Sequence, residues 1–230
     1  MGIISRALAA ALLIATAVTP AAAAAQDETF SPDWDAMSGA LRERRFADLL
    51  RLADEAIAHS PPLEDSEGRR VLCAHSDVEA VLYAALPDPD GQGTIVRNAA
   101  PCNLLFYRAY ALEELGRRAQ AMELMGSLTR YAPFWPQYHA EYGYVLAQSG
   151  RPEEALAQYR QVIDALELLA DEIDKEHWSA VAQRGIGYAL IDLKRWDEAE
   201  AAYRKSLDHD PDNAVAQHEL EFIARERPRD

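Results

Sequence analysis

The sequence lacks the short motifs that mark common enzyme classes. No glycine-rich phosphate loop and no nucleophile elbow occurs in the chain. The six histidines do not have the spacing of metal ligands, and adjacent carboxylates such as Glu153 and Glu154 diverge on a helix. These absences predict a protein without a catalytic site, metal or cofactor, and they leave a hydrolytic enzyme as the third alternative.

Basic residues are also in short supply. Lysine and arginine total 23 against 38 aspartates and glutamates, so the formal net charge is −15. Such an acidic surface repels phosphate groups, which makes nucleic acid and anionic membranes poor partners. The charge favours a neutral or basic protein segment instead.

A hydrophobic run long enough to span a membrane is missing. The N-terminal apolar stretch from Ala7 to Val18 is shorter than the ~20 residues that a spanning helix needs. It follows one basic residue, Arg6, and precedes a run of small residues ending at Ala25, which is typical of a secretory signal peptide. We therefore expect residues 1–25 to be cleaved, the mature chain to be periplasmic or secreted, and no membrane insertion after cleavage.

Cysteine is rare, with one pair in the whole chain. In an oxidising compartment an even pair tends to join, so we expect a disulfide between Cys73 and Cys102. The alternative is a metal site that also uses His75. Structural zinc usually has four ligands with tighter cysteine spacing, so the disulfide is favoured.

One pattern occurs three times between Tyr107 and Tyr203. Each copy has a small residue, a tyrosine, a short turn, an alanine and then a bulky apolar residue. The alanines of the first two copies are 34 residues apart, and the third follows after 44. Strong helix formers flank each turn, which predicts two amphipathic helices per copy. The alanines are Ala121, Ala155 and Ala199, and the small residues are Ala109, Gly143 and Gly187.

This order and period resemble the tetratricopeptide repeat family, over about Cys102 to Asn213. The resemblance implies an all-α fold, an α-α superhelix of stacked helix pairs. It divides the chain into a signal peptide (1–25), an N-terminal helical region with one degenerate repeat and a disulfide-linked insertion (26–101), three repeats (102–213) and a capping helix with tail (214–230). The degenerate repeat is the segment from Arg44 to Pro62, which matches the second half of a copy.

Two segments depart from the repeat. Between Leu63 and Pro101, Ser76 and Glu79 predict a capping box that opens a helix to about Leu86, followed by a turn-rich loop. The ten extra residues of the second repeat continue the apolar stripe to Ile173, which predicts a helix longer by roughly three turns. One interpretation is that this helix forms a contact ridge, but an insertion tolerated at a loop is favoured.

In proteins of this family the first helices of the pairs line a concave groove that binds an extended peptide or helix of a partner. The resemblance places the tyrosine of each copy in that groove, with other residues one helical turn away. The other interpretation of the tyrosines is packing between repeats. The expected groove residues are Tyr110, Tyr144, Tyr188, Phe106, Glu114, Gln148, Arg184 and Asp192.

The family's basic clamp for a partner's C-terminal carboxylate is not reproduced here. Only Arg184 matches it, because Phe106 and Ala140 stand at the equivalent positions of the other copies. The sequence therefore predicts a non-enzymatic interaction scaffold for a neutral or basic segment of another protein. The alternative is a self-associating module of the cell envelope, in which the chain forms a homo-oligomer.

Overall fold

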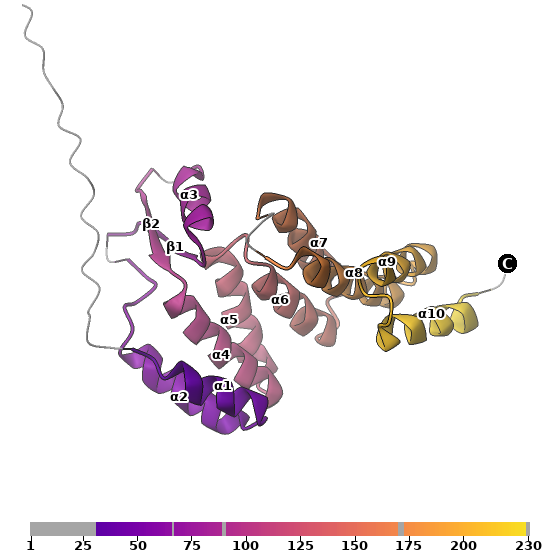
Figure 1. Cartoon of the computed structure of the whole chain (residues 1–230), viewed down its shortest axis with the longest axis horizontal. Helices are drawn as coiled ribbons and strands as arrows, with labels where there is room; N and C mark the ends of the chain where they lie inside the picture. Colours follow the sequence, from indigo (N-terminus) through magenta and orange to yellow (C-terminus); the bar gives the residue numbers. More distant parts are fainter. Residues whose placement is uncertain (1–30, 66, 89–90, 170–172, 229–230) are drawn as a thin grey trace, which may run out of the picture. The chain divides into compact units, whose positions relative to one another are not determined.

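The computed structural model describes residues 31–65, 67–88, 91–169 and 173–228, and residues from Pro32 onward form one compact unit. The predicted signal peptide lies outside the described residues. Within them the chain is mainly helical, and consecutive helices are paired as antiparallel neighbours (Figure 1). The three predicted repeats are α4 (Ala100–Glu114) with α5 (Arg118–Tyr131), α6 (Pro136–Gln148) with α7 (Pro152–Leu168), and α8 (Lys175–Asp192) with α9 (Trp196–His209). The all-α repeat fold is confirmed.

The turn inside each pair has one conformation throughout. The second residue after the first helix is left-handed, with φ of 75° at Gly116, 70° at Gly150 and 57° at Lys194. This conformation ends a helix by satisfying its last carbonyl groups, and glycine adopts it without strain. Arg44, with φ of 55°, occupies the same place between α1 (Trp34–Arg42) and α2 (Phe46–Ala58). The first two helices therefore form a helix pair of the same type as the repeats.

The small residues of the repeats accommodate aromatic rings. A Cβ atom built on Gly143 would lie 3.0 Å from the ring of Tyr159, and one on Gly187 would lie 2.6 Å from the ring of Tyr203. Gly185 is the tightest of these positions, at 2.3 Å from Tyr159. Tyr159 of α7 thus packs against both α6 and α8, and it is 5% exposed. Ring packing, rather than direct contact between backbones, explains why these positions are small.

The replacement Gly185→Ala should destabilise the protein by about 2–3 kcal/mol, because the added methyl group overlaps the Tyr159 ring and forces α7 and α8 apart. The comparison is Gly39→Ala in α1, where a Cβ would have no neighbour within 4 Å. That change should stabilise the helix by about 1 kcal/mol. Urea unfolding of both variants gives the measurement, and equal effects at the two sites would contradict the packing described here.

The extra ten residues of the second repeat do not form one long helix. The prediction of a helix continuing to Ile173 was wrong, because α7 ends at Leu168 and α8 begins at Lys175, capped by the Asp174 side chain. Compared with the preceding repeat, the additional residues lengthen the end of α7, the loop and the start of α8. The insertion is therefore accommodated around a loop. The chain then ends with α10 (Ala214–Glu226), whose first turn is capped by Asn213.

The segment between α2 and α4 contains two strands that the sequence analysis did not predict. Strands β1 (Arg70–Ala74) and β2 (Thr94–Asn98) pair in parallel, with Arg70 opposite Thr94 and Ala74 opposite Asn98. Helix α3 (Asp77–Ala85) connects them and packs on both strands. Of the predicted capping box, the Ser76 half is present, since its side chain accepts from the backbone N–H of Glu79. The Glu79 carboxylate accepts from the backbone N–H of His75 instead of that of Ser76. We call residues 70–98 the βαβ insert; part of its predicted turn-rich loop is strand β2.

The predicted disulfide between Cys73 and Cys102 is confirmed. It joins β1 of the insert to the first turn of α4, and both residues are fully buried. Because both sulfur atoms are committed to this bond, the alternative of a metal site with His75 is ruled out. The bond fixes the insert to the start of the first repeat.

A buried polar network also holds the insert against the repeats. The Glu79 carboxylate, which is fully buried, accepts from the His75 backbone N–H at 2.6 Å and lies 3.2 Å from His75 Nδ1. It accepts a further bond from the Tyr83 hydroxyl, whose oxygen in turn accepts from the Phe134 N–H. His75 Nε2 lies 3.1 Å from the Tyr138 hydroxyl of α6. The network therefore connects α3 and the residue after β1 with the loop before α6 and with α6 itself.

Candidate functional site

The three tyrosines predicted to contact a partner differ in exposure. Tyr144 of α6 is 47% exposed and Tyr188 of α8 is 40% exposed, which is unusual for large aromatic side chains. Tyr110 of α4 is half-buried and packs against the core of the first repeat. We use the name tyrosine face for the surface formed by these three tyrosines and by Glu114, Gln148, Arg184 and Asp192.

On α4, Tyr110 and Glu114 belong to one local cluster with the first helix pair. The Tyr110 ring lies 6.2 Å from the ring of Phe46. Arg44 pairs with Glu114 at 3.3 Å. Burial and the nearby Glu114 and Glu141 raise the pKa of Tyr110, so its hydroxyl remains a hydrogen-bond donor at neutral pH.

On α6 and α8, the predicted residues meet across the two helices. Gln148 donates from Nε2 to the Tyr188 hydroxyl at 3.4 Å, so Tyr144, Gln148 and Tyr188 belong to one continuous surface. Asp192 is exposed one turn after Tyr188. Arg184, one turn before Tyr188, pairs with Asp210 at 3.4 Å, so its charge is already partly compensated.

Phe106 does not belong to the exposed surface. Its side chain is 7% exposed and lies in the core of the first repeat with Cys73, Cys102 and Tyr138. Its ring is 5.5 Å from the Tyr138 ring. The sequence analysis missed this because the residues that bury Phe106 come from the insert and from the next repeat. Phe106 is therefore removed from the set of candidate contact residues.

Glu141 belongs to the tyrosine face, although the sequence analysis did not select it. It lies on α6, three residues before Tyr144 and seven before Gln148, which places it on the same stripe of the helix. Burial and the neighbouring Glu114 raise the pKa of Glu141 to about 7. The spacing to Tyr144 was a signal available in the sequence, whereas its burial depends on how the neighbouring helices pack.

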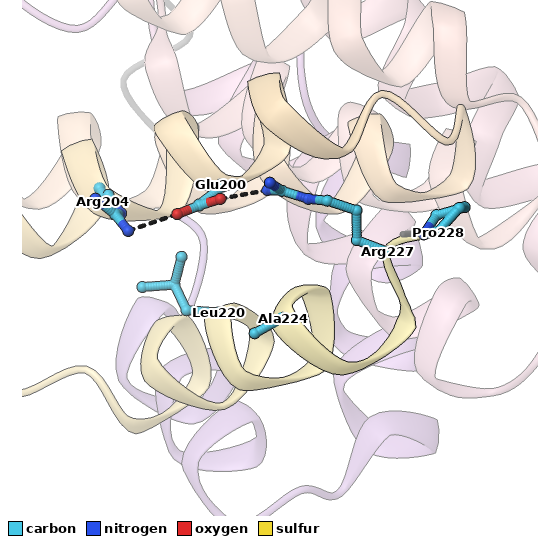
Figure 2. A pocket seen from close by; sticks show the side chains of 6 residues that line it. All are labelled: Glu200, Arg204, Leu220, Ala224, Arg227 and Pro228. Carbon is cyan, nitrogen blue, oxygen red and sulfur yellow. Dashed lines mark hydrogen bonds and ion pairs between the residues drawn. The ribbon is translucent and has the colours of Figure 1, made fainter. Parts of the chain in front are cut away.

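A pocket of about 400 Å³ lies elsewhere, between α9 and α10 (Figure 2). Its apolar lining comes mainly from Leu220, Ala224 and Pro228. The charged residues on its wall pair with one another, since Glu200 binds both Arg204 and Arg227. No residue of the tyrosine face lines this pocket, and its charges are compensated internally.

Two further features are absent from the part of the chain that the structure describes. No group of three or more His, Cys, Asp or Glu side chains there is placed to hold a metal ion. None of the helices described there is both long enough and apolar enough to cross a membrane.

Comparison with known sequence families identifies the repeats. Residues 104–134 and residues 180–213 each match a model described as tetratricopeptide repeat. The first segment lies within α4 and α5 and the connection that follows, and the second within α8 and α9 and the connection that follows. None of the curated proteins matches the chain.

Solved structures with a similar fold include three of the protein MamA. MamA from residue 41 onward, of Desulfovibrio magneticus RS-1, has a TM-score of 0.53 and 18% identity over 82% of this chain and 80% of its own. A double mutant of MamA RS-1 has the same score and identity over 82% and 79%. MamA MSR-1 has a score of 0.50 and 14% identity over 82% and 81%. At these identities the likeness concerns the fold. The two matched segments, with the paired helices and their common turn, show that the chain contains tetratricopeptide repeats.

Proposed function

We propose that the protein is an exported interaction scaffold that binds a neutral or basic segment of another protein on its tyrosine face. The observation that carries the proposal is the exposure of Tyr144 and Tyr188, at 47% and 40%, on consecutive repeats. Tyrosine combines a large contact area with a hydrogen-bonding hydroxyl and loses little conformational entropy on binding. Such residues are favoured at binding surfaces.

Charge supports the same partner class. Glu113, Glu114, Glu141 and Asp192 lie on or beside the tyrosine face, and the whole chain has a formal net charge of −15. A surface of this sign attracts basic segments and repels acidic ones. Export is supported by the N-terminal sequence and by the buried disulfide, which forms in oxidising compartments.

The experiment is site-specific photo-cross-linking in cells that export the full chain. A photoreactive phenylalanine derivative is placed at position 144 or 188, and at position 215 as a control. Val215 of α10 is 61% exposed and lies outside the tyrosine face, so it matches the tyrosines in accessibility. We expect one discrete protein adduct from positions 144 and 188 in the periplasmic fraction and none from position 215.

The double variant Tyr144→Ala, Tyr188→Ala tests the energetic role of the rings. It should weaken binding of the cross-linked partner by at least ~100-fold, on the scale of two hot-spot residues. The melting temperature should fall by only a few degrees, because both rings are largely exposed. Tyr110 is left unchanged because it packs against the core. Unchanged affinity of a folded double variant would show that the tyrosine face is not the binding surface.

A further inference from the structure

The carboxylates of the tyrosine face differ in whether a cation already neutralises them. Glu114 pairs with Arg44 at 3.3 Å, and Glu113 Oε1 pairs with Arg118 Nε at 3.1 Å. The other oxygen of Glu113, Oε2, is buried and has no hydrogen-bond partner. One acceptor of this pair of neighbouring glutamates is therefore unsatisfied.

Glu141 is the carboxylate of this surface that lacks a counterion. Within the described part of the chain, no hydrogen bond or ion pair reaches its side chain. The titratable groups that interact electrostatically with it are Glu114 and Tyr110 of α4, Tyr144 of its own helix and Tyr159 of α7. Two arginines of this surface, Arg44 and Arg118, are engaged by Glu114 and Glu113. A half-buried carboxylate without a counterion thus lies on the same stripe of α6 as the exposed Tyr144.

This combination is suited to a positively charged side chain. The face of an aromatic ring attracts a cation, and the attraction strengthens when the cation leaves water. A half-buried carboxylate without a counterion is partly desolvated, and a cation that pairs with it stabilises its ionised form. An anionic or purely apolar side chain would leave Glu141 unpaired.

We infer that the tyrosine face recognises an arginine or lysine side chain of its partner, and that Glu141 is the residue that selects this cation. The inference rests on the proposed function, because it names the partner chemistry of the same surface. It adds a specificity-determining residue to the contact area supplied by Tyr144 and Tyr188.

The pairing makes binding dependent on pH. The pKa of Glu141 is raised to about 7 in the free protein, so a large fraction of the side chain is protonated at neutral pH. A bound cation stabilises the ionised form and therefore lowers this pKa. Affinity should accordingly rise with pH up to about 7 and become constant above it, with about a tenfold difference between pH 6 and pH 8.

The test uses a library of random 12-residue peptides displayed on phage and selected on the mature protein at pH 8. We expect the selected peptides to be enriched in arginine or lysine, and enrichment to disappear in a selection on Glu141→Gln. The matched control is Glu123→Gln on α5, an exposed glutamate that undergoes the same change in charge. That variant should select the same basic peptides as the parent protein.

The outcomes separate this inference from the proposed function. Selected peptides that lack basic residues, but whose binding requires Tyr144 and Tyr188, would overturn the inference and leave the proposed function unaffected. If no peptide of the library binds, or if the selected peptides bind without Tyr144 and Tyr188, both the inference and the proposed function would be overturned.

One selected peptide without histidine is then measured by calorimetry from pH 6 to pH 8.5. Its affinity for Glu141→Gln should be at least tenfold lower than for the parent at pH 8 and should not change with pH. The variant should also melt at a higher temperature than the parent at pH 8 and at nearly the same temperature at pH 4. Ionisation of the Glu141 carboxyl destabilises the folded state only above the pKa that this group has in the unfolded chain. The destabilisation reaches its full size above about pH 7. A parent affinity that is independent of pH would contradict the role of Glu141.

Discussion

Replacement of Glu79 by alanine should destabilise the protein by about 3–5 kcal/mol. The carboxylate is fully buried and accepts bonds from the His75 N–H and the Tyr83 hydroxyl while facing His75 Nδ1. Removing it leaves these groups buried without an acceptor, and each such group costs about 1–3 kcal/mol. Unfolding in urea, followed by circular dichroism at pH 7, measures the change.

The control for Glu79 is Asp77→Ala on the same helix. Asp77 is exposed in the first turn of α3, where an acidic residue contributes at most about 1 kcal/mol through the helix dipole. A loss below about 1 kcal/mol for Glu79→Ala, equal to that of the control, would show that the network does not hold the insert. The more conservative Glu79→Gln keeps the shape of the side chain and should give an intermediate loss.

The double replacement Cys73→Ala, Cys102→Ala should cost about 3.5 kcal/mol. The two cysteines are separated by 29 residues, and in the chain-entropy model a crosslink closing a loop of this size reduces the freedom of the unfolded chain by that amount. The comparison is made by urea unfolding without reductant. A loss of less than about 1 kcal/mol would contradict this expectation.

A second measurement on the disulfide separates its role in the folded state from its role in the unfolded chain. Both cysteines are fully buried, so the native protein should resist reduction by dithiothreitol until it is partly unfolded. Mass spectrometry after thiol alkylation should show no labelled cysteine in native protein and two in urea. Rapid labelling under native conditions would mean that the insert opens readily.

The repeats could be predicted from the sequence because each copy repeats the same roles. The alanines at 121, 155 and 199 each pack in the core with 0% exposure, and the bulky residue four positions later packs beside them. Because a periodic pattern of this kind depends on local helix geometry, it can be recognised in the sequence without knowledge of the tertiary structure. The disulfide followed equally directly from the pair of cysteines and the N-terminal segment.

The strands of the insert could not be recognised in the same way. Each has five residues, and a short apolar run does not distinguish a strand from a buried helix segment. Their pairing also depends on α3 and on contacts with α4 and α5.

The role of the candidate site in binding stays a prediction. Gln148 and Tyr188 lie within hydrogen-bond distance because they occupy repeated positions on the first helices of adjacent pairs. Phe106 occupies such a position too, but the insert and Tyr138 bury it. Glu141 was missed because its partial burial depends on packing between helices, and the sequence of α6 alone does not show it.

The most direct test of the account is a map of amide chemical shifts on the mature protein. A basic peptide chosen in the selection is added stepwise to isotope-labelled protein at pH 8. The account predicts that the shifts change around Tyr110, Glu141, Tyr144, Gln148 and Tyr188, and that they do not change in Tyr144→Ala, Tyr188→Ala protein that remains folded. Changes confined to the α9–α10 pocket or to the βαβ insert would contradict the claim that the tyrosine face binds the partner.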